Sequence, residues 1–249
     1  MEIALLTALG VGGATIIGAL IGFLTEKISH KFSDYVLGFA AGIMLCASVV
    51  GLIIPSVEVG SVYTAIIGVI VGAVVLNLID AFTPHLHNNS TGLEETHPKN
   101  NKKLNKILLF VLAIAIHNFP EGIAAGVGFG TGNNADAISI AIGIALQNIP
   151  EGMVIIAPMV AVGISKKKAL LIASLTGVIE VIGTILGYFA VTISTAILPF
   201  ALAFAGGTML YIISDEMIPE THSHGNERGA TYAIIIGFCV MLLIDVLLG

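Results

Sequence analysis

Two six-residue segments of the sequence combine imidazole, amide and carboxylate side chains inside long apolar runs. Residues 117–122 read His-Asn-Phe-Pro-Glu-Gly, and residues 147–152 read Gln-Asn-Ile-Pro-Glu-Gly. In each segment the first and fifth residues are four positions apart, so on a helix they lie on one face. Imidazole, carboxylate and amide oxygens without thiolate suit borderline divalent cations such as Zn²⁺, Fe²⁺, Mn²⁺ or Cd²⁺. The spacing therefore predicts a metal site between two facing helices.

Polar side chains inside the apolar runs are the candidate metal ligands. Glu180, in a third run, adds a carboxylate to those of the two segments. A charge at the bilayer centre costs about 2.5–3.5 kcal/mol, so three glutamates facing lipid would cost roughly 8–10 kcal/mol. That is comparable to the whole stability of a typical domain, about 5–15 kcal/mol. These carboxylates must therefore face one another, water or a cation. The predicted ligands are His117, Asn118, Glu121, Gln147, Asn148, Glu151 and Glu180.

The proline in each segment, Pro120 or Pro150, predicts a kinked helix close to the metal site. Proline lacks an N–H, and its ring clashes with the carbonyl four residues back, here that of Ile116 or Leu146. A carbonyl freed in this way within a membrane is tolerated only beside a cavity. One such segment could equally be a polar cluster for helix packing, but two on consecutive apolar runs favour a binding site.

A weaker repeat follows two other apolar runs. Asp80 and Asp215 each precede a proline by four positions, and acidic or histidine side chains come after it. The pattern predicts a cytoplasmic region where metal leaves or is sensed, with ordinary polar capping as the alternative. The possible exit ligands are Asp215, Glu216 and His222, and His85, His87 and His224 are weaker candidates.

Composition places these motifs in a membrane protein. Of the 249 residues, 56% are hydrophobic and only 10% are charged, against about 25% charged in soluble domains. So few charges exclude a soluble enzyme and a disordered chain. A net charge of -6 with 10 Lys and Arg residues disfavours nucleic-acid binding. Cys46 and Cys239 both lie inside apolar runs and provide neither a disulfide framework nor a thiolate cluster.

Eight apolar runs are long enough to cross a bilayer, which takes roughly 20 residues per helix. We therefore predict an all-α integral membrane protein: a single domain, residues 1–249, in which eight transmembrane helices form a bundle and the kinked fourth and fifth form a central metal site. Pro199 supports the start of the seventh, and Glu2 argues against a cleavable signal peptide. The predicted spans are residues 3–25, 34–54, 62–83, 106–130, 136–163, 168–188, 196–217 and 230–248.

The basic residues predict the orientation in the membrane. All ten Lys and Arg residues fall in the loops that follow odd-numbered spans. By the positive-inside rule these loops are cytoplasmic and both termini lie outside, as in an inner or cell membrane protein. The longest loop, residues 85–105, is polar and histidine-containing, so we predict a flexible cytoplasmic segment.

Small residues at helical spacing suggest where helices pack. In the first and third spans we assign them to close helix packing. In the sixth span the stripe surrounds a carboxylate, which favours a pathway lining instead. That stripe consists of Ala173, Thr176, Gly177, Glu180, Gly183, Thr184 and Gly187.

At these residues the sequence resembles the ZIP family of divalent-metal transporters, in particular its short bacterial-type members. The similarity rests on residues 117–122 and 147–152, on Glu180 within residues 175–180, and on residues 216–222 after the seventh span. Eight spans, outside termini and a histidine-containing loop between spans three and four also agree with the family.

The resemblance implies a binuclear site between spans four and five. One ion would be held by His117, Glu121, Gln147 and Glu151, and the other by Asn118, Asn148, Glu180 and the same two glutamates as bridges. Gln147 stands where many members have His, and Asn148 where some have Asp; both changes lower ligand charge or basicity. The resemblance also implies a homodimer, membrane lipid around it, and elevator-like movement of metal, most readily Zn²⁺, into the cytoplasm. Divalent cations are then the substrate, and no organic cofactor or nucleic acid is expected.

Three other functions remain alternatives. An intramembrane metalloenzyme would need two His on one helix or three firm ligands, whereas the spans hold one His, so we predict that the protein is not an enzyme. A proton-coupled carrier of small solutes could use the glutamates as relays, but the spans lack Trp and Arg. A passive, channel-like metal pore is not separated from a carrier by the sequence.

Overall fold

A computed structural model describes residues 1–25, 28–82, 117–161 and 163–248. Within these ranges all regular structure is helical, with no strand, which confirms the all-α prediction. Residues 117–127 are helical as well. The elements are α1 (Glu2–Leu24), α2 (His30–Cys46), η1 (Ala47–Ile53), α3 (Ile54–Val59), α4 (Val62–Phe82), η2 (Gly128–Thr131), α6 (Asn134–Ala161), α7 (Lys166–Ile193), η3 (Thr195–Ile197), α8 (Leu198–Ile212), η4 (Ile213–Met217), α9 (Ile218–Thr221) and α10 (Glu227–Leu248).

Seven helical stretches in the described ranges are long and apolar enough to cross a membrane, and they coincide with seven of the eight predicted spans. The remaining prediction, residues 106–130, is described only from residue 117 onward. The predicted loop at residues 85–105, with His85, His87 and His97, lies outside the described residues. The seven stretches are Glu2–Leu24, His30–Val59, Val62–Ile79, Asn134–Ala157, Lys166–Ile193, Thr195–Thr221 and Glu227–Leu248.

Local sequence explains several helix ends. Ser29 caps α2, because its hydroxyl accepts a hydrogen bond from the backbone N–H of Phe32 at 3.2 Å. Helix α7 ends at Ile193, and Pro199 stands in the first turn of α8, where its missing N–H costs nothing. The predicted division between the sixth and seventh spans is therefore confirmed. Helix α6 continues through Pro150, which leaves the Leu146 carbonyl without its usual helical donor.

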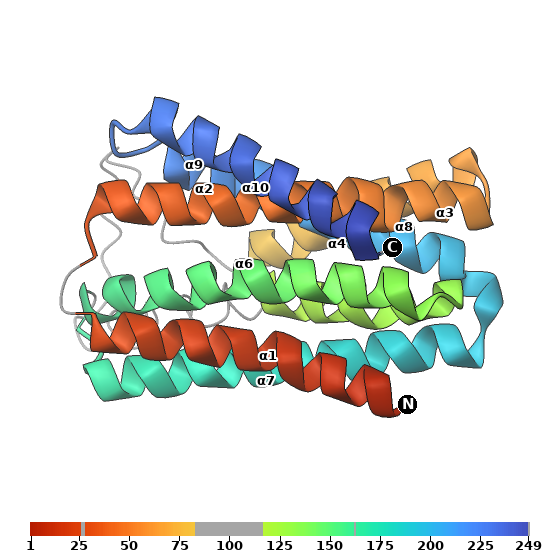
Figure 1. The fold of residues 1–249 in the computed structure, drawn as a ribbon, viewed down its shortest axis with the longest axis horizontal. Helices are drawn as coiled ribbons and strands as arrows, with labels where there is room; N and C mark the ends of the chain where they lie inside the picture. Colours follow the sequence, from red (N-terminus) through yellow and green to blue (C-terminus); the bar gives the residue numbers. More distant parts are fainter. Residues whose placement is uncertain (26–27, 83–116, 162, 249) are drawn as a thin grey trace.

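The helices form two groups, which we name the first and second bundles. In the first bundle α1 packs along α6 and α7, and residues 117–127 pack on α7. In the second bundle α2 packs on α10, and α4 packs on α8. Figure 1 shows the two bundles as an upper and a lower layer. Helix α6 also contacts α2 and α10, so it joins the layers.

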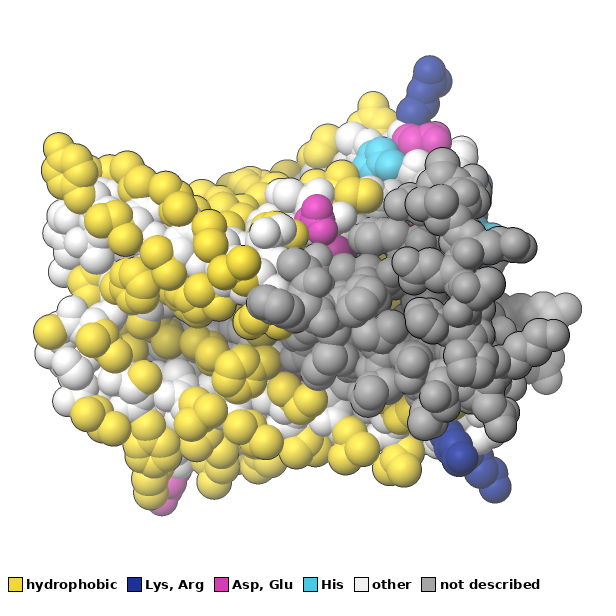
Figure 2. Space-filling model, turned by 180° about the vertical axis from the view of Figure 1, so that it is seen from behind, with side chains coloured by type: hydrophobic (Ala, Val, Ile, Leu, Met, Phe, Trp, Pro, Cys, Tyr) yellow, Lys and Arg dark blue, Asp and Glu magenta, His cyan; other side chains and the backbone are white. Residues whose placement is uncertain are grey.

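The ends of the bundles differ in charge. The start of α1 and the end of α10 lie at one end, whereas α2, α7 and α10 begin at the other (Figure 1). The described basic residues stand in the first turns of these three helices: Lys31, Lys166, Lys167, Lys168 and Arg228. Between the ends, large apolar side chains such as Ile66, Ile70 and Leu243 are exposed. Hydrophobic side chains cover much of the described part of the face in Figure 2. An apolar surface next to a basic end suits a bilayer.

Glycine sets the spacing between helices at the two predicted segments. A methyl group on Gly122 would lie 2.3 Å from the carbonyl oxygen of Glu180, and one on Gly152 would lie 2.4 Å from that of Thr15. Both distances are far below van der Waals contact. The last residue of each segment therefore lets its helix touch the backbone of α7 or α1, next to the predicted ligands.

Replacing Gly152 with alanine should destabilise the protein, because the new methyl group would collide with the backbone of α1. Overpacking of this kind typically costs about 1–3 kcal/mol. Gly10→Ala is the matched control, since nothing lies within 4 Å of a methyl group there. The melting temperature of the detergent-solubilised protein should fall for Gly152→Ala and not for Gly10→Ala. Equal melting temperatures would show that α1 and α6 separate at little cost.

Candidate metal centre

The predicted ligands of the two segments and Glu180 converge in the interior of the first bundle. Three come from the helical residues 117–127, three from α6 and one from α7. Glu121 is 1% exposed and Glu180 is fully buried. The carboxyl group of Glu121 interacts electrostatically with those of Glu151 and Glu180. The structure thus brings the three costly carboxylates together, away from lipid, as the sequence predicts.

We name these seven side chains the central cluster, and unpaired polar atoms are concentrated in it. Among the described residues, every buried side-chain nitrogen or oxygen without a hydrogen-bond partner belongs to one of four residues here. A buried polar group that lacks a partner typically costs about 1–3 kcal/mol. Carboxylate and amide oxygens recover such a cost by binding a cation. The atoms are Oε2 of Glu121, Oε1 and Nε2 of Gln147, Oδ1 of Asn148 and Oε1 of Glu151.

Gln147 is the clearest example of a buried side chain whose polar atoms lack hydrogen-bond partners. Its side chain is fully buried and interacts with Glu121, yet neither end of its amide has hydrogen-bond geometry to any described group. A histidine at this position would add a basic ligand, whereas the amide contributes one neutral oxygen. The donor set around Glu121 and Glu151 is therefore oxygen-rich, which suits an ion that must be released.

Glu180, unlike Gln147, has a hydrogen-bond partner for each of its side-chain oxygens. The Thr15 hydroxyl donates a hydrogen bond to its Oε1 at 2.7 Å, and the Asn148 amide donates to its Oε2 at 2.7 Å. The Asn118 amide also donates to Oε1. These three donors come from α1, α6 and residues 117–127, so one carboxylate on α7 connects all four helices of the first bundle.

Thr15 is a member of this site that sequence reasoning missed. It lies in α1 among small residues that the sequence assigns to helix packing, and it is 1% exposed. The one signal in the sequence is a hydroxyl within a stripe of Gly and Ala. That signal is weak, because threonine in a membrane helix often bonds only to its own backbone.

His117 links the first bundle to the second. Its Nε2 lies 2.7 Å from Oε1 of Glu216, and each side chain is about 20% exposed. Glu216 stands in η4, a π-helical turn that follows α8. Such turns often occur at functional sites. The pair therefore joins the central cluster to one of the predicted exit ligands.

The other predicted exit residues have different environments. Asp215 is exposed. The ring nitrogens of His222 make hydrogen bonds to the Ile218 carbonyl at 2.9 Å and the Thr231 hydroxyl at 3.1 Å, so this ring holds the turn between α9 and α10. His224 pairs with the buried Asp34 at 2.9 Å. The structure thus brings Glu216, but neither His222 nor His224, to the central cluster.

The small residues of α7 serve packing. A methyl group on Gly183 would lie 2.7 Å from the Phe119 carbonyl oxygen, and one on Gly187 would lie 2.5 Å from that of Ile123. Gly177 is equally close to the backbone of Gly12. The expectation that the glycines of this stripe line a pathway is therefore wrong, because helix backbones fill the space beside them.

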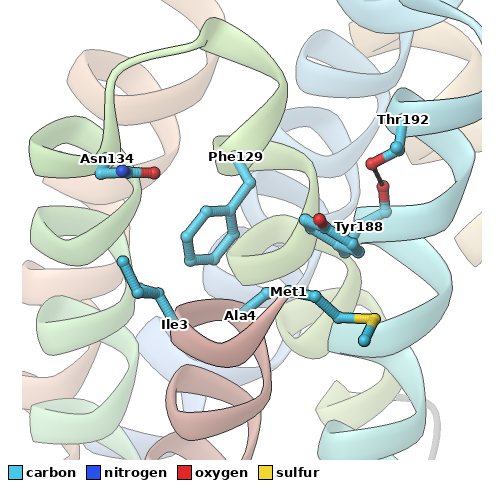
Figure 3. Close-up of a pocket in the computed structure, with 7 residues that line it drawn as sticks. All are labelled: Met1, Ile3, Ala4, Phe129, Asn134, Tyr188 and Thr192. Carbon is cyan, nitrogen blue, oxygen red and sulfur yellow. Dashed lines mark hydrogen bonds between the residues drawn. The ribbon is translucent and has the colours of Figure 1, made fainter.

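A separate pocket lies at the end of the first bundle where α1 begins. Its lining includes Met1, Phe129, Asn134, Tyr188 and Thr192 (Figure 3). The Phe129 and Tyr188 rings meet edge to face, with centroids 5.9 Å apart. Its lining contains no carboxylate or imidazole, so it lacks the ligands of the central cluster.

The central cluster is not a closed coordination shell in this conformation. Within the described ranges, no three His, Cys, Asp or Glu side chains are placed so as to hold one metal ion. The unpaired amide oxygen of Gln147 is available to complete a shell around Glu121, and so is His117 once it moves away from Glu216. Both options fit an ion that is bound transiently.

Comparison with known proteins shows the family to which this chain is similar. The family model described as ZIP zinc transporter matches residues 82–245. The zinc transporter GufA of Myxococcus xanthus is 38% identical over all of both chains. The zinc transporter ZIPB of Bordetella bronchiseptica is 36% identical over 95% of this chain and 78% of its own. The zinc transporter ZupT of Chlorobaculum parvum is 38% identical over 92% and 91%.

These matches define an integral membrane protein that transports divalent metal cations and is not an enzyme. The chain belongs to the ZIP zinc transporter family.

Replacing Glu121 with glutamine should preserve the fold and abolish stabilisation by metal. The substitution removes a buried charge, which relieves a desolvation cost, but it also removes a charged ligand. Cd²⁺ at about 100 times its Kd should stabilise the parent by about 2.7 kcal/mol and the variant by far less, as read from melting temperatures. Glu58→Gln, at an exposed carboxylate in α3, is the control and should respond like the parent. Equal metal responses in all three proteins would remove Glu121 from the site.

Proposed function

We propose that this protein carries divalent cations, Zn²⁺ above all and also Fe²⁺, Mn²⁺ or Cd²⁺, into the cytoplasm through a site formed by His117, Glu121, Gln147 and Glu151. The observation that supports the proposal most is the set of unpaired buried atoms on Glu121, Gln147 and Glu151. A cation gives these oxygens the partner that the protein does not supply. Carboxylate, imidazole and amide oxygen together, without thiolate, suit divalent cations of this group.

The second group of ligands implied by the family has a different character here. Asn118 and Asn148 turn their amide nitrogens toward Glu180. The binuclear arrangement, with Asn118, Asn148 and Glu180 around a second ion, is therefore less supported than the first site.

Release of the ion toward the cytoplasm is proposed to pass Glu216. Its pairing with His117 supports this path, because it places a carboxylate of the second bundle next to a ligand of the first. Asp215, one residue earlier and exposed, is the next candidate along the path. His222 is an exit ligand only after its bonds to Ile218 and Thr231 break.

A movement of one bundle relative to the other would expose the proposed metal site to the two sides of the membrane in turn. Packing is most extensive within each bundle, and α6 carries much of the contact between them. We propose the elevator-like movement implied by the family, with the first bundle carrying the ion past the second. The homodimer that the family implies is proposed on that resemblance alone.

Uptake into liposomes tests the transport proposal. The purified protein should show saturable uptake of Zn²⁺ and Cd²⁺, whereas a passive pore would give flux that rises linearly with concentration. Glu121→Ala and Glu151→Ala should nearly abolish uptake, because each removes a charged ligand from a low-dielectric site. His117→Ala should weaken uptake strongly, and Asn118→Ala should change its rate or selectivity.

The control for these variants is Glu58→Gln at matched protein amounts, which should transport like the parent. Parental uptake by both glutamate variants would show that the two segments serve packing and that the ion passes elsewhere.

Cysteine labelling tests the proposed orientation, with both termini outside and the basic helix starts in the cytoplasm. In a background with Cys46 and Cys239 replaced by serine, a cysteine at Asp136 should react with an impermeant reagent on intact cells. A cysteine at Lys167 should react only after the cells are opened. The reason is the gathering of Lys and Arg at one end of the bundles. Labelling of both positions from outside would overturn the orientation.

A further inference from the structure

Glu180 is the one glutamate of the central cluster whose two oxygens both accept hydrogen bonds from described side chains. Oε1 accepts from the Thr15 hydroxyl and the Asn118 amide, and Oε2 accepts from the Asn148 amide. In contrast, Glu121 and Glu151 each keep an unpaired buried oxygen. The cluster thus divides into carboxylates that lack partners and one that has several.

We propose that Glu180 is a hydrogen-bonded anchor rather than a metal ligand, that Thr15, Asn118 and Asn148 hold it, and that the central site accordingly binds one ion per chain. The proposal rests on the function proposed above and specifies its stoichiometry. It departs from the binuclear arrangement that the family implies.

Residue 148 is an asparagine, and its amide supplies a hydrogen-bond donor where an aspartate would supply a second carboxylate. An aspartate here would place a second carboxyl group against Glu180, and two buried carboxyl groups in contact need a shared proton or a cation between them. Asparagine instead presents an N–H₂ group 2.7 Å from Oε2. The positive end of the amide dipole stabilises the Glu180 carboxylate, as a second ion would. The reverse orientation of the amide would set oxygen against oxygen, so the hydrogen bond also fixes which end faces Glu180.

The other end of the same amide supports this assignment. Oδ1 of Asn148 is buried and unpaired, as is one carboxylate oxygen of each of Glu121 and Glu151. Asn148 therefore gives its donor to the anchor and keeps an acceptor that a single ion beside the two glutamates can use.

Thr15 is the positioning residue of the anchor. Its hydroxyl reaches Glu180 at 2.7 Å, and its carbonyl oxygen lies against Gly152, directly after Glu151. The position of α1 is thereby tied both to α7 and to the second predicted segment. Thr15 itself contacts the anchor and has no need to contact the ion.

Counting bound ions tests the proposal. Purified parent protein is equilibrated with Cd²⁺, and the metal is measured per chain. The count of the Glu121→Gln variant, which lacks the central site, is subtracted to remove ions held by surface histidines. The parent should bind one central ion. Asn148→Asp should bind two, because the new carboxylate faces Glu180 without a donor.

Two further variants distinguish whether Glu180 is a hydrogen-bonded anchor or a metal ligand. Thr15→Val removes the hydroxyl at nearly constant shape and should lower the melting temperature while the count stays at one. Thr15→Ser should restore the melting temperature, which loss of packing alone would not predict because serine is smaller than valine.

The outcomes are distinguishable. Two central ions in the parent, with uptake intact, would overturn the one-ion proposal and leave the transport function standing. A count that stays at one in a folded Asn148→Asp variant would show that residue 148 does not set the stoichiometry. No central ion and no uptake in the parent would overturn the proposed function and this inference with it.

Discussion

The structure depends on the burial of three carboxylates in the interior of a helical bundle whose described basic side chains stand at helix ends. Glu121, Glu151 and Glu180 lie within electrostatic range of one another, so each must be compensated locally. The environments of these carboxylates differ. Hydroxyl and amide donors surround Glu180, whereas Glu121 and Glu151 keep oxygens whose natural partner is a cation. In the proposed function, structural and transport roles are thus divided among chemically identical side chains by the donors around them.

Close helix packing is what allows this division. Donors on three helices reach one carboxylate because the backbones nearly touch, at Gly122 against Glu180 and at Gly152 against Thr15. A side chain at either glycine would move the donors outward. The segment glycines therefore determine the hydrogen bonding of Glu180, although they carry no functional group. In a membrane, where apolar burial gives little drive for helix association, such contacts and polar bonds hold the bundle together.

Sequence reasoning succeeded where one helix holds the information. Span positions follow from runs of apolar residues, and the placement of His117 and Glu121 on one face of a helix follows from helical periodicity. It failed where the result depends on how helices rotate against each other. The Thr15 bond to Glu180 joins residues 165 positions apart, and periodicity does not say which faces meet. The glycines of α7 looked like a pathway lining for the same reason, since a small residue beside a carboxylate suits both a pore and a contact.

The pairing of His117 with Glu216 shows how the same side chains can serve two states. One ring nitrogen, Nε2, lies 2.7 Å from the carboxylate of the second bundle, and a nitrogen that pairs with a carboxylate cannot coordinate an ion at the same time. Binding of an ion through Nε2 therefore requires this contact between the bundles to open. Conversely, in the proposed site, closing the contact would remove an imidazole from the ligands around Glu121 and Glu151 and would weaken the binding of the ion. If His117 is a ligand as proposed, ion affinity and the contact between the bundles are linked through a single imidazole, because the cost of breaking one bond is offset by making the other.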